Sequence, residues 1–331
     1  MLPTTETVPA HGMHSAAVLG AGTMGLGIAS VLCLAGMDVV LCDVDPALTI
    51  AARRRLRRRA EAQVEAGLIS SESLTRIDEV VATHPPADAV AAADLVVEAA
   101  PENLLLKQNL LEVASRAAPD GAAIATNTSS YPIDTLAESV HLPERFLGMH
   151  WFNPPEWIPG VELVAGTQTS PHVLERCRLL LRSAGKRPTD VASSPAFIAN
   201  RLQMAMFLES VSCLEDGLGS AEQIDEIVRN TFGFRLPHYG PFEIADMAGL
   251  DVYLSVFRTL EEALGPRFTP PPQLVELVEA GKYGTKQGGG FRDHSDEDAT
   301  RLIRERDLRY AAMSRFLGGL PARHDEHETP G

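Results

Sequence analysis

One histidine and one glutamate in this chain have a spacing that suits proton transfer. The stretch GMHWFNPPEWIPGVELV places His150 twelve positions before Glu162, with three prolines between them. Because proline cannot donate a backbone hydrogen bond and resists continuing a strand, the chain should leave a strand after His150 and return near Glu162. A carboxylate returning beside an imidazole would fix its tautomer and stabilise its protonated form, as a catalytic base requires.

The same two residues also fit a plain structural interpretation. A single histidine at the end of a strand is more often structural than catalytic, and Glu162 lies between Val161 and Leu163, where it could be an ordinary surface charge. These residues alone leave both interpretations open.

A glycine-rich turn lies near the beginning of the chain. Gly20, Gly22 and Gly25 have G-x-G-x-x-G spacing, in which the glycines allow a tight turn, a close approach to a pyrophosphate and close helix packing. Three glycines by themselves can form a simple turn. Here they follow an apolar run, precede a helix-like segment and stand about twenty residues before Asp43, which together favour a dinucleotide site.

Acidic residues after the second apolar run indicate which dinucleotide binds. A carboxylate at Asp43 would accept hydrogen bonds from the adenosine ribose and repel a 2′-phosphate. Asp45 adds a second negative charge, and no arginine is adjacent in sequence. The pattern therefore predicts NAD rather than NADP.

Apolar runs alternate with helical patterns over the first part of the chain. This order predicts an α/β fold, a Rossmann-type doubly wound sheet over residues 1–194, followed by an all-helical C-terminal domain over 195–331. Ser194 and Pro195 should start a long apolar helix that lies at a domain or subunit interface. The first and last dozen residues look loose. Strands are expected at 16–19, 37–45, 79–84, 94–100, 122–126, 145–151 and 161–165.

Composition restricts the class of protein. A net charge of −15 over 331 residues argues against a nucleic-acid partner. The four cysteines lack C-x-x-C spacing, which indicates reduced thiols, and the ten histidines lack metal-ligand spacing. The stretch MLPTTETVPAHGMHS does not show the basic-then-apolar pattern expected of a secretion signal, and no apolar run reaches the ~18 residues that a membrane span needs. We therefore expect a cytoplasmic protein with no metal and no membrane partner.

An arginine run interrupts this acidic composition. Leu48, Ala52, Leu56 and Ala60 have i, i+4 spacing and are expected to pack inward, leaving the arginines outside. A solvated helix, with ion pairs such as that of Arg57 with Glu61, is one interpretation. A grip on substrate phosphates is the other, since guanidinium groups suit phosphate. The run comprises Arg53, Arg54, Arg55, Arg57, Arg58 and Arg59.

Motifs along nearly the whole chain resemble those of the L-3-hydroxyacyl-CoA dehydrogenases. They are GAGTMG, VVEAAPENLLLK, TNTSS, GMHWFNP with VELV, FIANRLQ and GPFEIADMAGLD, in the family's order and spacing. The resemblance implies that His150 is the catalytic base, that Glu162 is its partner, and that Ser129 and Asn200 contact the substrate. It also implies an NAD site that includes Gly20, Gly22, Thr23, Met24, Gly25, Asp43, Glu102, Lys107 and Asn127.

The implied reaction is the reversible NAD-dependent oxidation of an (S)-3-hydroxyacyl-CoA to its 3-oxo form, in fatty acid metabolism. The resemblance, together with the strongly apolar helix over 196–214, implies that the C-terminal domain serves substrate binding and dimerisation, so that the enzyme is a homodimer. By the same resemblance, Arg53, Arg54 and Arg57 would hold the coenzyme A phosphates, although an acyl carrier protein could use the same surface.

The loop PEWIPG differs from the fatty-acid enzymes and is closer to the L-gulonate and L-carnitine dehydrogenases. A dehydrogenase of a free hydroxy acid is therefore one alternative, and a non-catalytic NAD-binding structural protein is another.

Overall fold

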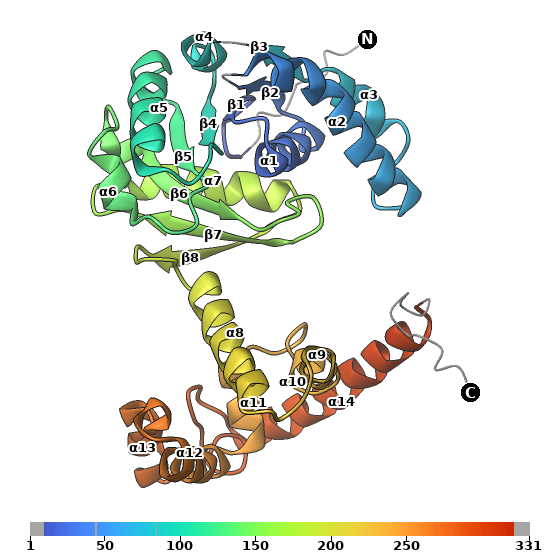
Figure 1. Ribbon diagram of the computed structural model, residues 1–331, viewed down its shortest axis with the longest axis vertical. Coiled ribbons are helices and arrows are strands. Elements are labelled where there is room, and N and C mark those ends of the chain that lie inside the picture. Colours follow the sequence, from blue (N-terminus) through green and yellow to red (C-terminus); the bar gives the residue numbers. More distant parts are fainter. Residues whose placement is uncertain (1–9, 44, 84, 321–331) are drawn as a thin grey trace. The chain divides into compact units, whose positions relative to one another are not determined.

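One eight-stranded sheet organises the first part of the chain (Figure 1). Its order is β3-β2-β1-β4-β5-β6-β7-β8, and every neighbouring pair is parallel except β6 with β7. The strands are β1 (Ser15–Leu19), β2 (Asp38–Cys42), β3 (Val81–Thr83), β4 (Leu95–Glu98), β5 (Ala123–Thr126), β6 (Phe146–Trp151), β7 (Gly160–Ala165) and β8 (Arg187–Ala192). This arrangement confirms the predicted Rossmann-type doubly wound sheet.

The structure is a computed structural model that describes residues 10–43, 45–83 and 85–320. The chain divides into two compact units, Met1–Met206 and Phe207–Gly331. The expectation of loose ends falls mainly on residues 1–9 and 321–331, which lie outside the described residues.

Helices cover both faces of the sheet because its strands are apolar on both sides. Ala16 and Val18 of β1 belong to a core with α1, α2, α3 and α7, whereas Ala17 and Leu19 belong to a core with α4, α5 and α6. Successive strand residues point to opposite faces, so one continuous apolar run serves two cores. The helices of this unit are α1 (Thr23–Leu34), α2 (Pro46–Glu65), α3 (Ser73–Asp78), α4 (Pro86–Val90), α5 (Leu104–Ala117), α6 (Ile133–Ala137), the 3-10 turn η1 (Pro143–Arg145) and α7 (Pro171–Ser183).

Two elements differ from expectation. Strand β8 was not predicted, because it is an edge strand whose sequence RPTDVA has one buried residue and no apolar run. The long helix α8 (Ala199–Glu215) begins at Ala199, so the predicted start at Ser194 and Pro195 was wrong. Residues 195–198 form turns instead, with positive φ at Ala196 and Phe197.

The second unit is helical over its described residues, as predicted. Its buried core is small and consists of Ala245, Leu250, Leu254 and Leu274. The division of the chain near residue 194 stays a prediction. The unit contains the end of α8 and then α9 (Ala221–Asn230), α10 (Phe232–Arg235), α11 (Pro241–Ala248), α12 (Leu250–Leu264), the 3-10 turn η2 (Pro266–Phe268), α13 (Pro272–Glu279) and α14 (Asp296–Gly318).

The described residues offer neither a membrane-spanning helix nor a metal-binding cluster. None of the described helices combines the length and apolar character needed to cross a membrane. No group of three or more histidine, cysteine, aspartate or glutamate side chains in the described part could hold a metal ion.

Candidate active site

His150 and Glu162 face each other across the one antiparallel pair of the sheet. They are directly opposite in the register of β6 and β7, and His150 Nδ1 lies 2.8 Å from Glu162 Oε2. Their side chains are only 5% and 8% exposed. Since a carboxylate only accepts hydrogen bonds, Nδ1 carries the proton and Nε2 keeps a free lone pair. The predicted outward loop and returning strand thus place the two residues together.

Glu162 has a second contact that the sequence did not reveal. Its Oε1 atom accepts the backbone N–H groups of Ile198, at 3.1 Å, and Ala199, at 2.9 Å. N–H groups at the start of a helix have no partner within the helix itself. The Glu162 carboxylate, on strand β7, supplies that partner and so caps α8. The same contact explains why α8 begins at Ala199 and not at Pro195.

A cavity of about 690 Å³ joins the histidine to the glycine turn. It brings together six of the residues that the sequence proposed for catalysis or cofactor binding: Met24, Glu102, Asn127, Ser129, His150 and Asn200. Asn200 Nδ2 donates to the Ser129 carbonyl at 3.2 Å, so α8 and the loop after β5 are joined at the cavity. Ala99, Ala100, Trp151, Phe152, Asn153, Ile158 and Gln203 complete the lining.

The glycine turn has the shape that a dinucleotide needs. A Cβ at Gly20 would lie 2.6 Å from the Ala99 carbonyl oxygen, and one at Gly25 only 1.8 Å from that of Gly20. A Cβ at Gly22, by contrast, would meet no atom within 4 Å. Gly22 precedes α1, which has no side-chain cap, so the first N–H groups of that helix are available to an anion. The turn therefore fits a pyrophosphate.

Asp43 fixes this turn from the end of β2. Its Oδ2 accepts the Ala21 N–H at 2.7 Å, and its Oδ1 accepts the Asp45 N–H at 3.0 Å. Arg55 donates to the Ala21 carbonyl at 2.9 Å. Arg55 of α2 thus reaches the glycine turn, a contact that local spacing did not reveal.

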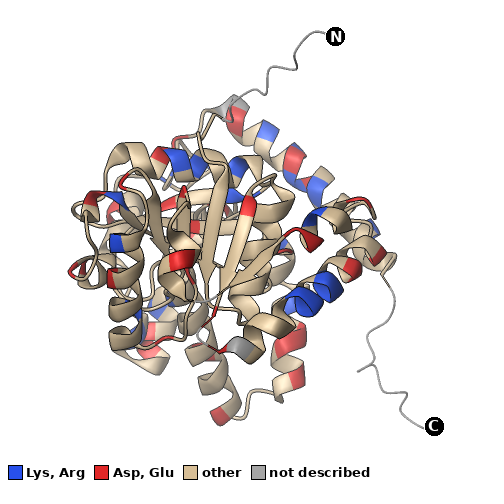
Figure 2. Cartoon of the chain, turned by 90° about the horizontal axis from the view of Figure 1, so that it is seen from above, with Lys and Arg blue, Asp and Glu red and all other residues tan. Residues whose placement is uncertain are grey.

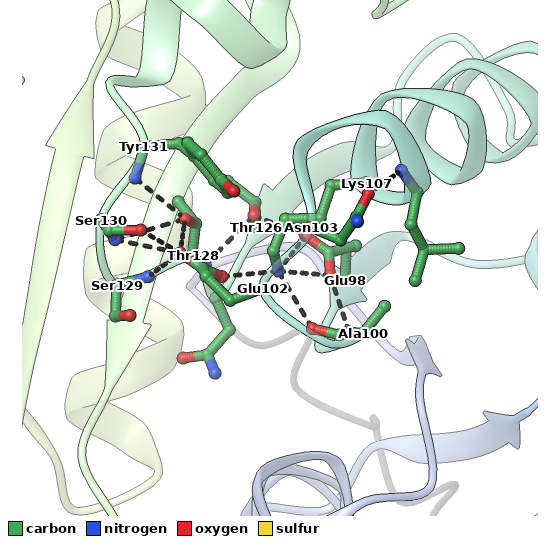
Figure 3. A network of polar contacts seen from close by, with 12 residues as sticks. Glu98, Ala100, Glu102, Asn103, Lys107, Thr126, Thr128, Ser129, Ser130 and Tyr131 are labelled. Atoms are coloured by element: carbon green, nitrogen blue, oxygen red, sulfur yellow. Dashed lines mark hydrogen bonds and ion pairs between the residues drawn. The ribbon is translucent and has the colours of Figure 1, made fainter.

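Lys107 does not line the cavity, and only 1% of its side chain is exposed. Its ammonium lies 2.8 Å from Glu98 Oε1 and 3.2 Å from Glu102 Oε2, in the polar network of Figure 3. Glu98 is fully buried and also accepts from Thr126 Oγ1, at 2.6 Å, and from the Ala100 N–H, at 2.7 Å. The network joins the ends of β4 and β5, and Glu98 is its unpredicted centre.

Glu102 holds the loop that carries Ser129. Its Oε1 atom accepts from Thr128 Oγ1 at 2.6 Å, from Ser130 Oγ at 2.7 Å and from the backbone N–H groups of Ser129 and Ser130, both at 3.1 Å. Burial raises the pKa of Glu102, but these hydroxyl groups and the Lys107 ammonium outweigh it and hold the pKa below its ordinary value. The carboxylate is therefore charged at neutral pH.

The arginine run lines a separate cavity of about 640 Å³. Arg53, Arg54 and Arg57 are among its lining residues, and the run forms a continuous blue band in Figure 2. The predicted ion pair of Arg57 with Glu61 is present at 3.0 Å. Ala52, Leu56 and Ala60 are buried as expected. Leu48 is 36% exposed because it lies in the first turn of α2, at the end of the helix.

The arginines of the run differ in what they contact. Arg53 donates to the Val80 carbonyl at 3.3 Å, and Arg59 binds Glu156. The guanidinium groups of Arg54 and Arg58 make no hydrogen bond or ion pair within the described part of the chain. An anionic ligand could bind these two cations without displacing a contact within the described residues.

Comparison with known proteins connects these features to a family. The description "3-hydroxyacyl-CoA dehydrogenase, NAD binding domain" matches residues 15–194, and "3-hydroxyacyl-CoA dehydrogenase, C-terminal domain" matches residues 197–294. The chain is 36% identical to a 5-formyl-3-hydroxy-2-methylpyridine 4-carboxylate 5-dehydrogenase of Mesorhizobium japonicum, over 93% of this chain and 99% of the relative. It is 33% identical to a probable 3-hydroxybutyryl-CoA dehydrogenase of Bacillus subtilis, over 85% and 97%.

Solved structures agree with this match. The crystal structure of a 3-hydroxyacyl-CoA dehydrogenase from Archaeoglobus fulgidus superposes with a TM-score of 0.75 at 30% identity, covering 92% of this chain and 99% of the other. The crystal structure of a 5-formyl-3-hydroxy-2-methylpyridine 4-carboxylic acid 5-dehydrogenase, described as NAD⁺-dependent, gives 0.70 at 36% identity, over 93% and 100%.

Proposed function

The chain belongs to the 3-hydroxyacyl-CoA dehydrogenase family of NAD-dependent oxidoreductases, and we propose that it interconverts an (S)-3-hydroxyacyl-CoA and its 3-oxoacyl form. The observation that carries the proposal is the His150 and Glu162 pair, because its imidazole lines a cavity that extends to the glycine turn. A structural NAD-binding protein has no need of a base in that place.

His150 acts as the base through Nε2. The hydrogen bond to Glu162 keeps the proton on Nδ1, so the Nε2 lone pair can accept the substrate hydroxyl proton. The carboxylate then stabilises the imidazolium that results. In the reverse direction the same nitrogen returns the proton to the oxygen.

Ser129 and Asn200 orient the reacting oxygen. Both line the cavity with His150, and each carries a neutral donor that can polarise a carbonyl. When bound, NAD⁺ would supply the hydride acceptor for the carbon that carries the hydroxyl. Its pyrophosphate would be held at the turn formed by Gly20, Gly22, Thr23, Met24 and Gly25, its adenosine ribose by Asp43, and its nicotinamide side by Glu102 and Asn127, with Lys107 as a buried support.

A neutral thioester suits this cavity better than a free acid does. Among the described residues that line it, none is lysine or arginine, and the charged one is Glu102. A free carboxylate close to the reacting carbon would therefore face a carboxylate and no cation. The cations lie instead along α2, where Arg53, Arg54, Arg57 and Arg58 surround the second cavity and can hold the coenzyme A phosphates.

One relative supports a second candidate. The Mesorhizobium enzyme is named for a free pyridine carboxylate, and it is similar to this chain over nearly its whole length. A dehydrogenase of a free hydroxy acid, like the L-gulonate and L-carnitine enzymes that the PEWIPG loop resembles, is therefore the alternative. In that case the arginine run is simply solvated.

An NADH-oxidation assay with matched substrates separates these candidates. The assay compares two groups of substrates. The thioesters are acetoacetyl-CoA, longer 3-oxoacyl-CoA esters, acetoacetyl-N-acetylcysteamine and an acyl carrier protein thioester. The free acids are the 3-oxo acids and the pyridine carboxylate for which the Mesorhizobium enzyme is named. We expect turnover with the CoA esters and a tenfold or larger rise of KM in Arg54→Ala/Arg58→Ala, with the N-acetylcysteamine ester unaffected. Arg182→Ala, at an exposed arginine of α7, is the control. Turnover of free acids alone would reject the thioester, and no turnover would favour a structural protein.

The second unit is proposed to pair with another copy of the chain. None of the 17 residues of α8 is buried, and Phe207 and Leu208 are 63% and 69% exposed. The unit's buried apolar cluster has four residues, which is small for about a hundred residues, so apolar surface of this kind requires a partner. Sedimentation is expected to give a homodimer that Leu208→Glu dissociates; a monomeric parent protein would contradict this.

Compartment and pathway follow from the same proposal. We expect a cytoplasmic enzyme, since its four cysteines are free thiols of the kind that a reducing compartment maintains. Fatty acid metabolism is the pathway proposed with the acyl-CoA substrate.

A further inference from the structure

The loop between β6 and β7, residues 152–159, is fixed by a lysine that comes later in the chain. Lys186 is 8% exposed, and its ammonium donates to the carbonyl oxygens of Pro155 at 2.5 Å, Ile158 at 3.0 Å and Glu156 at 3.4 Å. Three acceptors use all three protons of an ammonium group. The backbone of the loop is therefore gathered around one buried cation.

An arginine holds the same loop from the other side. Arg59 of α2 binds Glu156 in the bidentate manner, with Nη2 2.7 Å from Oε2 and Nε on Oε1. The Glu156 side chain is 1% exposed and that of Arg59 is 24% exposed. A charge-assisted pair of this geometry fixes direction as well as distance. A buried carboxylate has no comparable partner if the arginine is removed.

Helix α1 packs closely against the loop. A Cβ at Gly27 would lie 2.7 Å from Pro155 Cδ and 2.8 Å from Glu156 Oε2. The loop therefore approaches α1 as closely as a glycine permits. The loop is therefore held in place by contacts from three segments: α1, α2 and the residue before β8.

That position places an apolar side chain at the catalytic cavity. Ile158 lines it together with His150 and Asn200, whereas Arg59 and Lys186 do not. Ile158 is 37% exposed, so its own packing does not hold it there. Lys186 binds the Ile158 carbonyl itself, and Arg59 binds the side chain of Glu156, two residues before it.

We propose that Arg59 and Lys186 are positioning residues that set substrate range, by holding Ile158 as the wall of the cavity that limits the acyl substituent. The inference rests on the proposed dehydrogenase function. It identifies the group next to the reacting carbon as a small apolar chain, since Ile158 and Phe152 offer it no polar partner. Neither cation touches the substrate, and both act through the loop.

The test compares kcat/KM for acetoacetyl-CoA with that for a 3-oxodecanoyl-CoA in several variants. Ile158→Ala removes most of the wall and so enlarges the cavity directly. Arg59→Met and Lys186→Met release the loop that carries Ile158. All three are expected to raise the ratio of the long to the short substrate about tenfold, the effect of a few methylene groups in an apolar pocket. KM for NADH should stay within twofold. Arg59→Lys should restore part of the ratio, and Arg182→Met is the control.

A second measurement does not require turnover. The chain has two tryptophans, Trp151, 1% exposed, and Trp157, 45% exposed and inside the loop. Acrylamide quenching therefore reports mainly on Trp157, and it should increase in Arg59→Met and Lys186→Met but not in Arg182→Met. A changed quenching constant without any dehydrogenase activity would refute the proposed function, but it would still support the role of Arg59 and Lys186 in holding the loop. An unchanged quenching constant, or an unchanged substrate ratio in folded variants, would overturn the inference itself. If Lys186→Met does not fold, Ile158→Ala and Arg59→Lys still decide it.

Discussion

Glu162 binds His150 through one carboxylate oxygen and starts the helix of Asn200 through the other. The 2.8 Å contact with the imidazole and the 2.9 Å contact with the Ala199 N–H belong to the same buried side chain. Since α8 carries Asn200 into the catalytic cavity, one carboxylate aligns the base and a substrate-orienting amide together.

Replacing the base should stop the chemistry and spare the cofactor site. His150→Gln keeps a polar side chain of similar size but cannot accept the hydroxyl proton, so kcat should fall by about 10²–10⁴. NADH affinity, measured by fluorescence titration, should remain within twofold because His150 is not among the residues proposed to hold the dinucleotide. Near-normal turnover would refute the assignment of His150.

Replacing its partner tests the tautomer. A glutamine at position 162 has one acceptor oxygen, and if this oxygen keeps the two N–H groups of α8, its NH₂ group faces Nδ1. The proton then moves to Nε2, and His150 can no longer act as a base. Glu162→Gln is expected to lower kcat by up to about 10⁴, the loss known for a mis-set tautomer. Nitrogen NMR shifts of the His150 ring should show the exchange; an unchanged tautomer with unchanged kcat would contradict this account.

Breaking the buried ion pair should destabilise the first unit. Lys107→Met leaves Glu98 fully buried with no cation, and removing one partner of such a pair costs about 3–5 kcal/mol. Urea unfolding followed by circular dichroism measures this loss. Adding Glu98→Gln should recover part of it, because the neutral amide no longer needs the ammonium. A double variant less stable than Lys107→Met would argue against this explanation.

Glu102 should make stability depend on acid pH. Its folded-state pKa lies below its unfolded value, so its contribution is complete above the unfolded pKa and is lost as the pH falls through the folded one. The difference in unfolding free energy between the parent protein and Glu102→Gln should therefore be constant from neutral pH down to about 4.3, and then shrink. Urea titrations at several pH values measure it. A difference that grows as the pH falls would show that the pKa is raised instead.

Three of the four cysteines should resist modification. Burial raises the pKa of Cys177 to about 12 and those of Cys33 and Cys42 to about 11, so little thiolate forms at pH 8. Cys213, which is half-buried, should be the one thiol that reacts quickly with a disulfide reagent in the native protein. Cys213→Ser should remove this reaction; several fast thiols would indicate a looser core.

Features that repeat over a few residues could be predicted from the sequence. The apolar runs of seven strands, the glycine turn and the cap of α2 by Asp45 each depend on neighbours in the chain, and the structure contains all of them. The spacing of His150 and Glu162 was also readable, since prolines force the chain out of a strand and an antiparallel return places the two side by side.

Contacts between distant segments were decided by the tertiary structure alone. Arg59 and Glu156 are 97 positions apart, Glu162 caps a helix 37 positions later, and Lys107 is a buried support that a motif placed in the cofactor site. No local pattern encodes such pairs, because each depends on how the sheet brings separate loops to one edge. The short polar edge strand β8 was missed for the same reason, since it is held by its pairing with β7 and not by its own residues.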